Sequence, residues 1–279
     1  MDIFIYISLH TLNMWLLKSL SLDSVPTEVT LMVRGLGCIL MSLLFAYKNN
    51  YSISPKKPKL QFARLFIAGL GLGLMIASYQ YINASTVAVL FKFDVVFLIF
   101  ISMFLGKKAK GMIYYALGAF ALLSIHIFFF KENSENILGY VAALSGTFVI
   151  SIGFLLLNKS GKFENQAVTC LVPGVSISLF GLLLAFQKQG TYFDISNFSL
   201  LIALFSGFVM FAIYNYTLKL YRKHSVVFAE LLTFICIILF IPIEILGLKM
   251  SLSAQHLFSI LVIASYTLFV YFKKENLPM

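Results

Sequence analysis

Ten apolar runs, each about twenty residues long, follow one another along this sequence and limit what it can fold into. A bilayer core about 30 Å thick needs about 20 apolar residues in helical form. The runs are continuous rather than alternating, which argues against a membrane β-barrel. The predicted spans are 2–20, 27–47, 62–82, 84–105, 111–130, 137–157, 167–187, 197–217, 225–247 and 253–272. The sequence therefore predicts an all-α membrane protein with ten transmembrane helices.

The composition supports this class. Hydrophobic residues make up 60% of the 279 residues and charged residues 11%, with a mean hydropathy of +0.94, whereas soluble domains carry about 25% charged residues. No hydrophilic stretch is long enough to form a separate domain. Cys38, Cys170 and Cys236 all fall inside apolar runs, so we expect no disulfide framework. Residues 1–20 lack the features of a signal peptide and are expected to stay as the first helix.

The basic residues between the runs predict an orientation, because cytoplasmic loops carry an excess of Lys and Arg. With the N-terminus inside, the inner loops hold 15 basic residues and the outer loops four. Lys18 is an outer residue that argues the other way for the first helix. We therefore expect both termini in the cytoplasm and a multi-pass plasma-membrane protein, in a bacterium the inner membrane. The net charge of +10 then reflects topology, and no nucleic-acid partner is expected.

The two halves of the chain resemble each other. Residues 77–81 read Ala-Ser-Tyr-Gln-Tyr and residues 212–216 read Ala-Ile-Tyr-Asn-Tyr, each at the end of the third span of its half. The predicted repeats are residues 1–131 and 132–279. Because each copy has five spans, an odd number, the copies must be inverted relative to each other, as in many alternating-access carriers.

These features resemble the drug/metabolite transporter superfamily, which includes the EamA-type exporters and the nucleotide-sugar carriers. The resemblance rests on Pro26 with Val33-Arg34, on the stretch 79–90 that leads into the fourth span, and on 105–108 at its exit. The EamA-type pattern has a proline about where Asp94 stands, and Lys92 is similar to the fourth-span lysine of nucleotide-sugar carriers. The resemblance implies a ten-helix secondary transporter without cofactor or metal.

Four ionisable residues lie well inside the predicted spans, away from their ends, namely Arg34, Lys92, Asp94 and Glu230. A charge at the bilayer centre costs about 2.5–3.5 kcal/mol on insertion scales, so each must pair or face a wet cavity. In one continuous helix, Lys92 and Asp94 would lie on nearly opposite faces. We expect Lys92 to face a central cavity and Asp94 to bond Arg34 or another donor. Internal pairing of all four without substrate contact is the alternative, and Glu230 is a candidate proton carrier.

Aromatic and amide side chains at the ends of the third and eighth spans complete the candidate site. Tyrosines near a membrane interface often serve only as anchors; the alternative is that one tyrosine of each pair lines the cavity. A cationic substrate would also bind to aromatic faces. The candidate substrate-binding residues are Lys92, Asp94, Arg34, Glu230, Tyr79, Tyr81, Tyr214, Asn215, Tyr216 and Trp15. His10 and His126 are expected to be structural residues bonded to backbone carbonyls.

The expected function is secondary transport of a small polar or zwitterionic metabolite, amino-acid-like or nucleoside-linked, by alternating access. Exchange of phosphorylated or nucleotide-linked solutes is one alternative, with protons or a counter-substrate as further partners. A membrane-embedded lipid-processing enzyme and a channel are the others, but no catalytic motif such as His-Glu-x-x-His or Gly-x-Ser-x-Gly is present. We expect no enzyme activity, and a monomer or homodimer in the bilayer.

Overall fold

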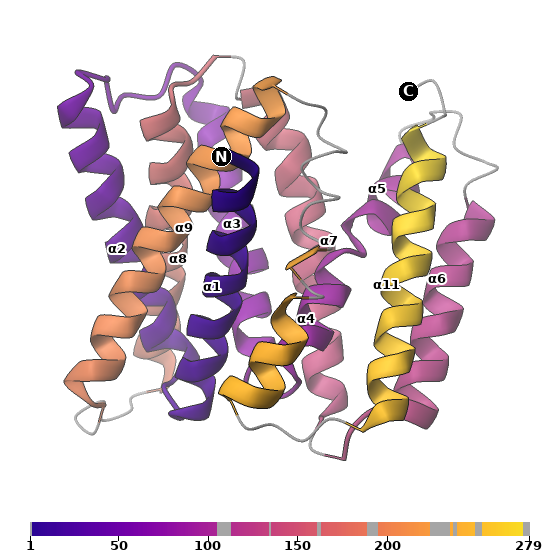
Figure 1. Ribbon diagram of the computed structural model, residues 1–279. Coiled ribbons are helices and arrows are strands. Elements are labelled where there is room, and N and C mark those ends of the chain that lie inside the picture. Colours follow the sequence, from indigo (N-terminus) through magenta and orange to yellow (C-terminus); the bar gives the residue numbers. More distant parts are fainter. Residues whose placement is uncertain are drawn as a thin grey trace.

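The computed structural model describes residues 2–104, 113–133, 135–160, 163–188, 195–223, 235–236, 239–248 and 253–275. All regular elements in these ranges are helical, which confirms the predicted class (Figure 1). The helices are α1 (Asp2–Leu22), α2 (Thr27–Lys48), α3 (Pro58–Ser78), α4 (Ala84–Phe91), α5 (Asp94–Phe104), α6 (Ile113–Ile125), α7 (Ile137–Ser160), α8 (Gln166–Lys188), α9 (Asn197–Lys223) and α11 (Ala254–Glu275), with the π-helical turns η2 (His126–Phe130) and η3 (Ile243–Gly247).

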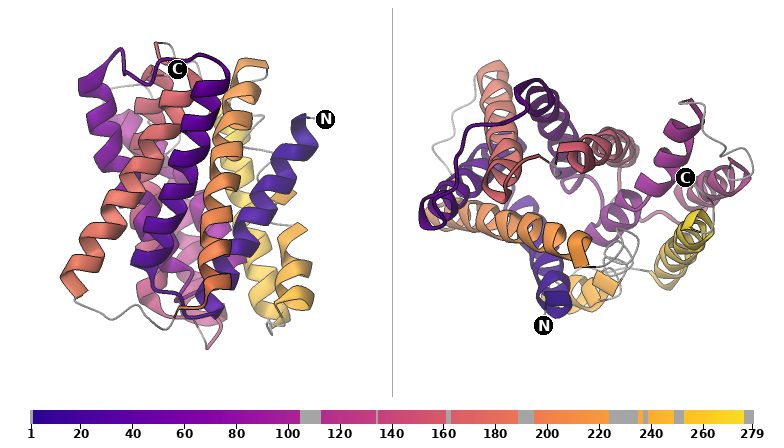
Figure 2. Two further views of the ribbon diagram at one scale, coloured as in Figure 1. Left: turned by 90° about the vertical axis from the view of Figure 1, so that its left-hand side faces the viewer. Right: turned by 90° about the horizontal axis from the view of Figure 1, so that it is seen from above.

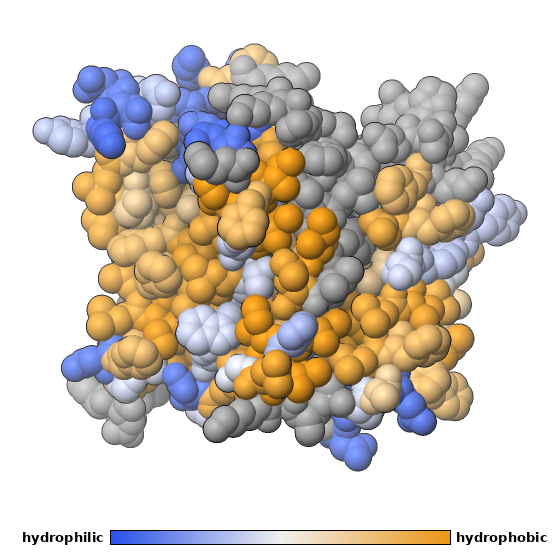
Figure 3. All heavy atoms as spheres, in the orientation of Figure 1, coloured by the Kyte–Doolittle hydropathy of each residue, from blue (hydrophilic) through white to orange (hydrophobic). Residues whose placement is uncertain are grey.

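Eight helical segments in the described part of the chain are long and apolar enough to cross a membrane. Large apolar side chains also lie on the outside of the bundle, where soluble proteins rarely gather them. On α2 the exposed ones recur along one face, at Leu36, Leu40, Leu43 and Leu44. Figure 3 shows hydrophobic residues over the middle of the visible surface and hydrophilic residues toward its two ends. The chain is a multi-pass membrane protein.

The helices pack in a defined set of pairs. α2 contacts α8 and α9, α3 contacts α7 and α8, and α1 contacts α9. α4 and α5 pack on α7, and α11 packs on α6, α4 and α5. Figures 1 and 2 show α6 and α11 side by side at one edge of the bundle, with α4 between them and the helices of the other edge.

Helix α3 begins and ends about four residues earlier than predicted. Pro58 opens its first turn, a position where the missing N–H of proline is not needed. The Glu164 carboxylate accepts hydrogen bonds from the Lys56 and Lys57 N–H groups just before it. Arg64 counts among the 15 inner-loop basic residues of the sequence prediction, but it is buried in this helix, where it donates to the Ser160 hydroxyl at 3.2 Å.

The fourth predicted span is not one helix, and this corrects the sequence prediction. Lys92 and Phe93 form a turn between α4 and α5, so the expected helical relation between Lys92 and Asp94 does not apply. Two hydroxyls of α7 bond to carbonyls beside the break: Thr147 to Leu90 at 3.3 Å and Ser151 to Asp94 at 3.4 Å. Hydropathy could not reveal this break because apolar residues continue through it.

Two further predictions fall largely outside the described residues. Of the span 225–247, the structure describes 235–236 and 239–247, and Glu230 lies outside. The exit motif at 105–108 also lies outside. The count of ten spans and the inverted repeat therefore remain predictions.

The turn between α3 and α4 is held by three buried charged residues, Lys18, Glu135 and Glu244, which we call the turn cluster. The Lys18 ammonium donates to the carbonyl oxygens of Tyr79 and Ile82 at 3.2 and 3.0 Å. Lys18 counts among the predicted outer-loop basic residues, but it lies in α1, with its ammonium inside the bundle. The lysine satisfies carbonyls that no longer have helical partners at the end of α3.

The two carboxylates of the turn cluster accept hydrogen bonds from the N–H groups at the start of α4, which have no partners within the helix. Glu244 accepts from the N–H of Ala84 at 2.7 Å and from that of Ser85 at 3.1 Å. Glu135 accepts from the N–H of Asn83 at 3.0 Å. Because negative charge is favourable at a helix N-terminus, these contacts fix where α4 starts and how it is directed.

Backbones approach closely where α2 crosses α9. A Cβ atom added to Gly207 would strike the Arg34 carbonyl oxygen and lie 2.9 Å from the Cys38 nitrogen. Gly37 faces Gly207 across the same contact. Small residues allow this approach in membrane helices.

We therefore expect Gly207→Leu to destabilise the protein by at least the roughly 1–3 kcal/mol that overpacking costs, measured as a lower melting temperature of the detergent-purified protein. Gly247→Ala is the control, because its added Cβ would lie 3.6 Å from the nearest atom, Ile243 Cγ2, an ordinary contact. Equal melting temperatures for Gly207→Leu and the wild type would contradict the backbone-contact interpretation.

Candidate functional site

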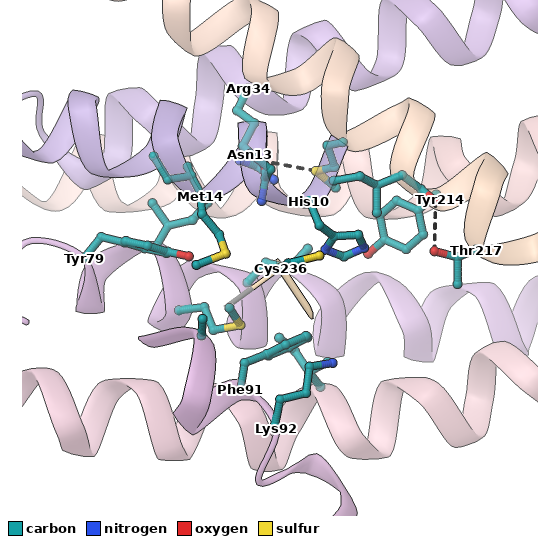
Figure 4. Close-up of a pocket in the computed structure, with 18 of the residues that line it drawn as sticks. His10, Asn13, Met14, Arg34, Tyr79, Phe91, Lys92, Tyr214, Thr217 and Cys236 are labelled. Atoms are coloured by element: carbon teal, nitrogen blue, oxygen red, sulfur yellow. Dashed lines mark hydrogen bonds between the residues drawn. The ribbon is translucent and has the colours of Figure 1, made fainter. Parts of the chain in front are cut away.

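A cavity of about 150 Å³ lies among α1, α2, α3, α4, α7 and α9 (Figure 4). It is smaller than the roughly 300–1,000 Å³ pockets that hold drug-sized ligands, so in this conformation it has room only for a small molecule. Its wall combines three methionines, Met14, Met75 and Met210, with polar side chains. The polar or titratable lining residues are Tyr6, His10, Asn13, Arg34, Tyr79, Lys92, Tyr214, Thr217 and Cys236.

Arg34 places a buried guanidinium in the cavity wall. Its side chain is only 4% exposed, and Nε donates to the sulfur of Met210 at 3.4 Å. The Nη1 atom has no hydrogen-bond partner among the described residues. A buried charged donor without a strong acceptor is costly. A carboxylate or phosphate group in the cavity would supply such an acceptor, and guanidinium groups bind both in a bidentate manner.

Lys92 supplies a second cation from the break between α4 and α5. Its side chain is buried, and Nζ lies 5.2 Å from the centroid of the Phe91 ring. Figure 4 shows Lys92 and Arg34 on opposite sides of the cavity. Discontinuous helices often line the midplane sites of carriers. The expectation that Lys92 faces a cavity agrees with its position in this wall.

One tyrosine of each predicted pair lines the cavity. Tyr79 and Tyr214 are lining residues, and both lie within electrostatic reach of Arg34. Tyr81 is 41% exposed and does not line the cavity. Tyr216 packs instead beside Tyr6 and Leu220.

The other predicted site residues lie elsewhere. Asp94 is buried at the start of α5 but does not line the cavity. Asn215 is buried in α9 and donates to the Phe211 carbonyl, and Trp15 is 37% exposed on α1. Glu230 lies outside the described residues. The structure thus brings together Arg34, Lys92, Tyr79 and Tyr214 of the ten candidates.

Sequence reasoning named only Trp15 on α1 and missed the residues of this helix that line the cavity. Tyr6, His10, Asn13 and Leu17 all line the cavity, and the buried Asn13 Oδ1 has no hydrogen-bond partner among the described residues. The His10 ring packs edge-on against Tyr6, with centroids 4.5 Å apart. These four positions recur at intervals of three and four residues, so they share one helix face. The polar members of this stripe, Tyr6, His10 and Asn13, stand inside an apolar run and were the available signal.

A second polar cluster, apart from the cavity, has the residue types of a metal site. Potential ligand atoms of His126, Glu135 and His256 lie within 4.8 Å of one another. The Tyr140 hydroxyl stands between two of them, 2.8 Å from His126 Nε2 and 2.5 Å from Glu135 Oε2. Its oxygen bridges these groups, so the arrangement is a hydrogen-bonded network rather than an open coordination site. His126 bonds to side chains here and not, as expected, to a backbone carbonyl.

Arg34 and Lys18, two of the buried cationic residues, should respond differently to replacement. We expect Arg34→Leu to leave the melting temperature unchanged or raise it, because its charge is poorly compensated. Lys18→Met should lower it, since losing one partner of a buried charged cluster costs about 3–5 kcal/mol. Thermal unfolding of both purified variants tests this. An equal loss of stability in both would show that Arg34 is a structural residue.

Comparison with known proteins gives a fold but no family. No protein-family model matches the sequence, and no curated protein matches it. A solved structure, described only as the crystal structure of a protein, is similar over 97% of this chain and 99% of its own, with a TM-score of 0.60 and 12% sequence identity. At that identity the likeness concerns the fold alone. The chain therefore shares, over nearly its whole length, a fold found in a solved crystal structure.

Proposed function

We propose that this protein is a secondary transporter of the drug/metabolite transporter type, and not an enzyme, which moves a small polar metabolite by alternating access. The observation that carries the proposal is the small cavity between membrane-spanning helices, with two buried cations on opposite walls. Intramembrane charges that face a cavity typically mark substrate or ion pathways. The family assignment rests on the sequence motifs.

The helix pairs support an inverted repeat of residues 1–131 and 132–279. In such a repeat α1 corresponds to α7, α2 to α8, and α3 to α9. Each contact in one half should then recur between the corresponding helices. The α1–α9 contact corresponds to α7–α3, and α2–α9 corresponds to α8–α3. All four contacts are present, and α7 begins at the end of the bundle where α1 ends (Figure 1).

The cavity wall favours a solute with an anionic group. Among the described lining residues, Arg34 and Lys92 are cationic and none is acidic. A carboxylate or phosphate could interact with Arg34, while Tyr79, Tyr214 and Asn13 offer hydrogen bonds to the rest of the solute. Amino-acid-like zwitterions and phosphorylated solutes both fit this chemistry. The three lining methionines can adjust to different shapes.

A ligand screen tests this proposal directly. We expect carboxylated or phosphorylated solutes to raise the melting temperature of the purified protein, because ligand binding stabilises the folded state by about 2.7 kcal/mol at a concentration 100 times the Kd. Quaternary amines should have no effect. Lys92→Ala should remove the stabilisation by the ligand while the protein stays monodisperse.

Lys59→Ala is the matched control, because Lys59 is an exposed lysine in the first turn of α3. It should keep the full response to the ligand. Stabilisation by cationic compounds alone, or an unchanged ligand response in Lys92→Ala, would contradict the proposed site. A ligand found in this way would then be tested for flux in proteoliposomes.

We also propose that the end of the bundle where α1 begins faces the cytoplasm. Lys48 at the end of α2 and Lys56, Lys57 and Lys59 around the start of α3 gather at this end. Figure 3 shows hydrophilic residues there, at its upper left. This is the distribution that the positive-inside rule describes.

Labelling of single cysteines in intact cells tests the orientation. We expect a membrane-impermeant maleimide to label Asn133→Cys, in the connection before α7, in intact cells. It should label Ile53→Cys, in the connection before α3, only after lysis. The native Cys38, Cys170 and Cys236 are buried and should contribute little background. The reverse labelling pattern would show the opposite orientation.

A further inference from the structure

A buried histidine and a buried carboxylate lie together at the end of the bundle where α1 finishes. His256, in the first turn of α11, is 0% exposed, and Glu135, just before α7, is 4% exposed. His256 Nδ1 lies 3.8 Å from Glu135 Oε2. Neither residue lines the cavity. The pair is therefore a separate site with its own chemistry.

The hydrogen bonds around His256 leave room for an additional proton. Its Nδ1 lies 3.1 Å from the Phe130 carbonyl oxygen, which only accepts, so Nδ1 carries a hydrogen. Its Nε2 lies 3.3 Å from the Thr86 hydroxyl, which is also 2.9 Å from Glu135 Oε1. That hydroxyl donates either to a neutral His256 or to Glu135. His256 can therefore gain a proton through a rotation of the Thr86 hydroxyl alone.

The charge of the turn cluster favours this added proton. Glu135 is one of its two carboxylates, and Lys18 is the buried ammonium that faces them, while the exposed Lys131 ammonium donates to the Glu135 main-chain carbonyl at 3.2 Å. Within the buried turn cluster, two carboxylates therefore face one ammonium as long as His256 is neutral. An uncompensated buried charge is unfavourable, and a proton on His256 would balance it.

Several of the neighbouring side chains are hydrogen-bonded to the His256–Glu135 pair or to one another. His126 bonds to the Ser259 hydroxyl at 2.6 Å and, through Tyr140, to Glu135. Partial burial alone would raise the pKa of Glu132, but hydrogen bonds from the Ser253 backbone N–H and side chain lower it, so Glu132 stays ionised near neutral pH. The titratable side chains around the pair are Lys18 on α1, Glu244 on η3, His126 on η2, Tyr140 on α7, and Lys131 and Glu132 in the connection before α7.

We propose that His256 and Glu135 form a proton-binding site, that its proton holds the α3–α4 turn closed, and that release of the proton is coupled to solute movement. The coupling rests on the proposed transport function. Its path is α4, which spans about 12 Å at 1.5 Å per residue. Glu135 and Glu244 bind its first N–H groups, and Lys92 follows its last residue in the cavity wall. Loss of charge balance at one end of α4 would therefore move a cavity residue at the other.

Trp15, the single tryptophan of the chain, reports on this site because it lies one turn before Lys18 on α1. We expect its fluorescence in the purified wild-type protein to show a one-proton transition between pH 5 and 9. Glu135→Gln and His256→Gln should each abolish the transition. Glu164→Gln is the matched control, since Glu164 is also a buried carboxylate bound to backbone N–H groups, but at the other end of the bundle.

A wild-type protein without the transition, or a transition that persists in both variants, would overturn the proposal. Loss of the fluorescence transition in Glu164→Gln as well would also overturn the proposal, because the transition would then not be specific to this site. If both variants fail to fold, wild-type hydrogen exchange at the Asn83, Ala84 and Ser85 amides decides. After correction for intrinsic rates, exchange should be faster above the transition pH, and equal protection on both sides would refute the proposal.

These measurements need no solute, so they are independent of the ligand screen. If the pH transition is observed but the ligand screen finds no ligand, the proton-binding site is supported and the transport proposal is contradicted. If a ligand is found but no pH transition is observed, the transport proposal is supported and the proton-binding site is contradicted. When both are found, flux of that ligand into proteoliposomes should depend on a pH gradient in the wild type and lose that dependence in Glu135→Gln.

Discussion

The α3–α4 turn determines much of the remaining structure, because its backbone groups are buried and must find partners inside the protein. Unpaired N–H and C=O groups at membrane depth cost several kcal/mol each. Here charged side chains from three distant segments supply the partners. Lys18 binds the carbonyls that end α3, and Glu135 and Glu244 bind the N–H groups that begin α4. One short turn thereby ties α1, η3 and the chain before α7 to a common point.

The position of α4 also determines which polar groups line the cavity. With α4 fixed at its first residues, the break after Phe91 falls beside the cavity and brings Lys92 into the wall. Arg34 reaches the opposite side from α2 (Figure 4). Cations that would be unfavourable against lipid are thus held apart around a small space. The wall therefore presents two cations to a solute, and none of its described lining residues is acidic.

Much of the fold was predictable from the sequence, and less of the site. Length and hydropathy alone predict most helices, since a lipid-exposed helix such as α2 must be apolar over its whole length. The same signal cannot reveal the break at Lys92, because apolar residues continue through it. Arg34 and Lys92 were predictable as candidate site residues, because a charged side chain inside a span must either pair with another group or face a water-filled cavity. Glu135 and Glu244 were not, because acidic residues near predicted loops look like ordinary loop residues until the fold brings them onto α4.

The contact between Gly37 and Gly207 has a consequence for how much sequence change such a fold tolerates. Where main chain meets main chain, the geometry of the crossing does not depend on the shapes of interlocking side chains. The surrounding apolar residues can then be exchanged for others of different shape, provided that the glycine positions stay small. Such crossings can support one fold in very different sequences, and this chain shares its fold with a solved structure at 12% identity over nearly the full length of both chains. Sequence drift would be slowest at the smallest residues and fastest at the large ones that face lipid.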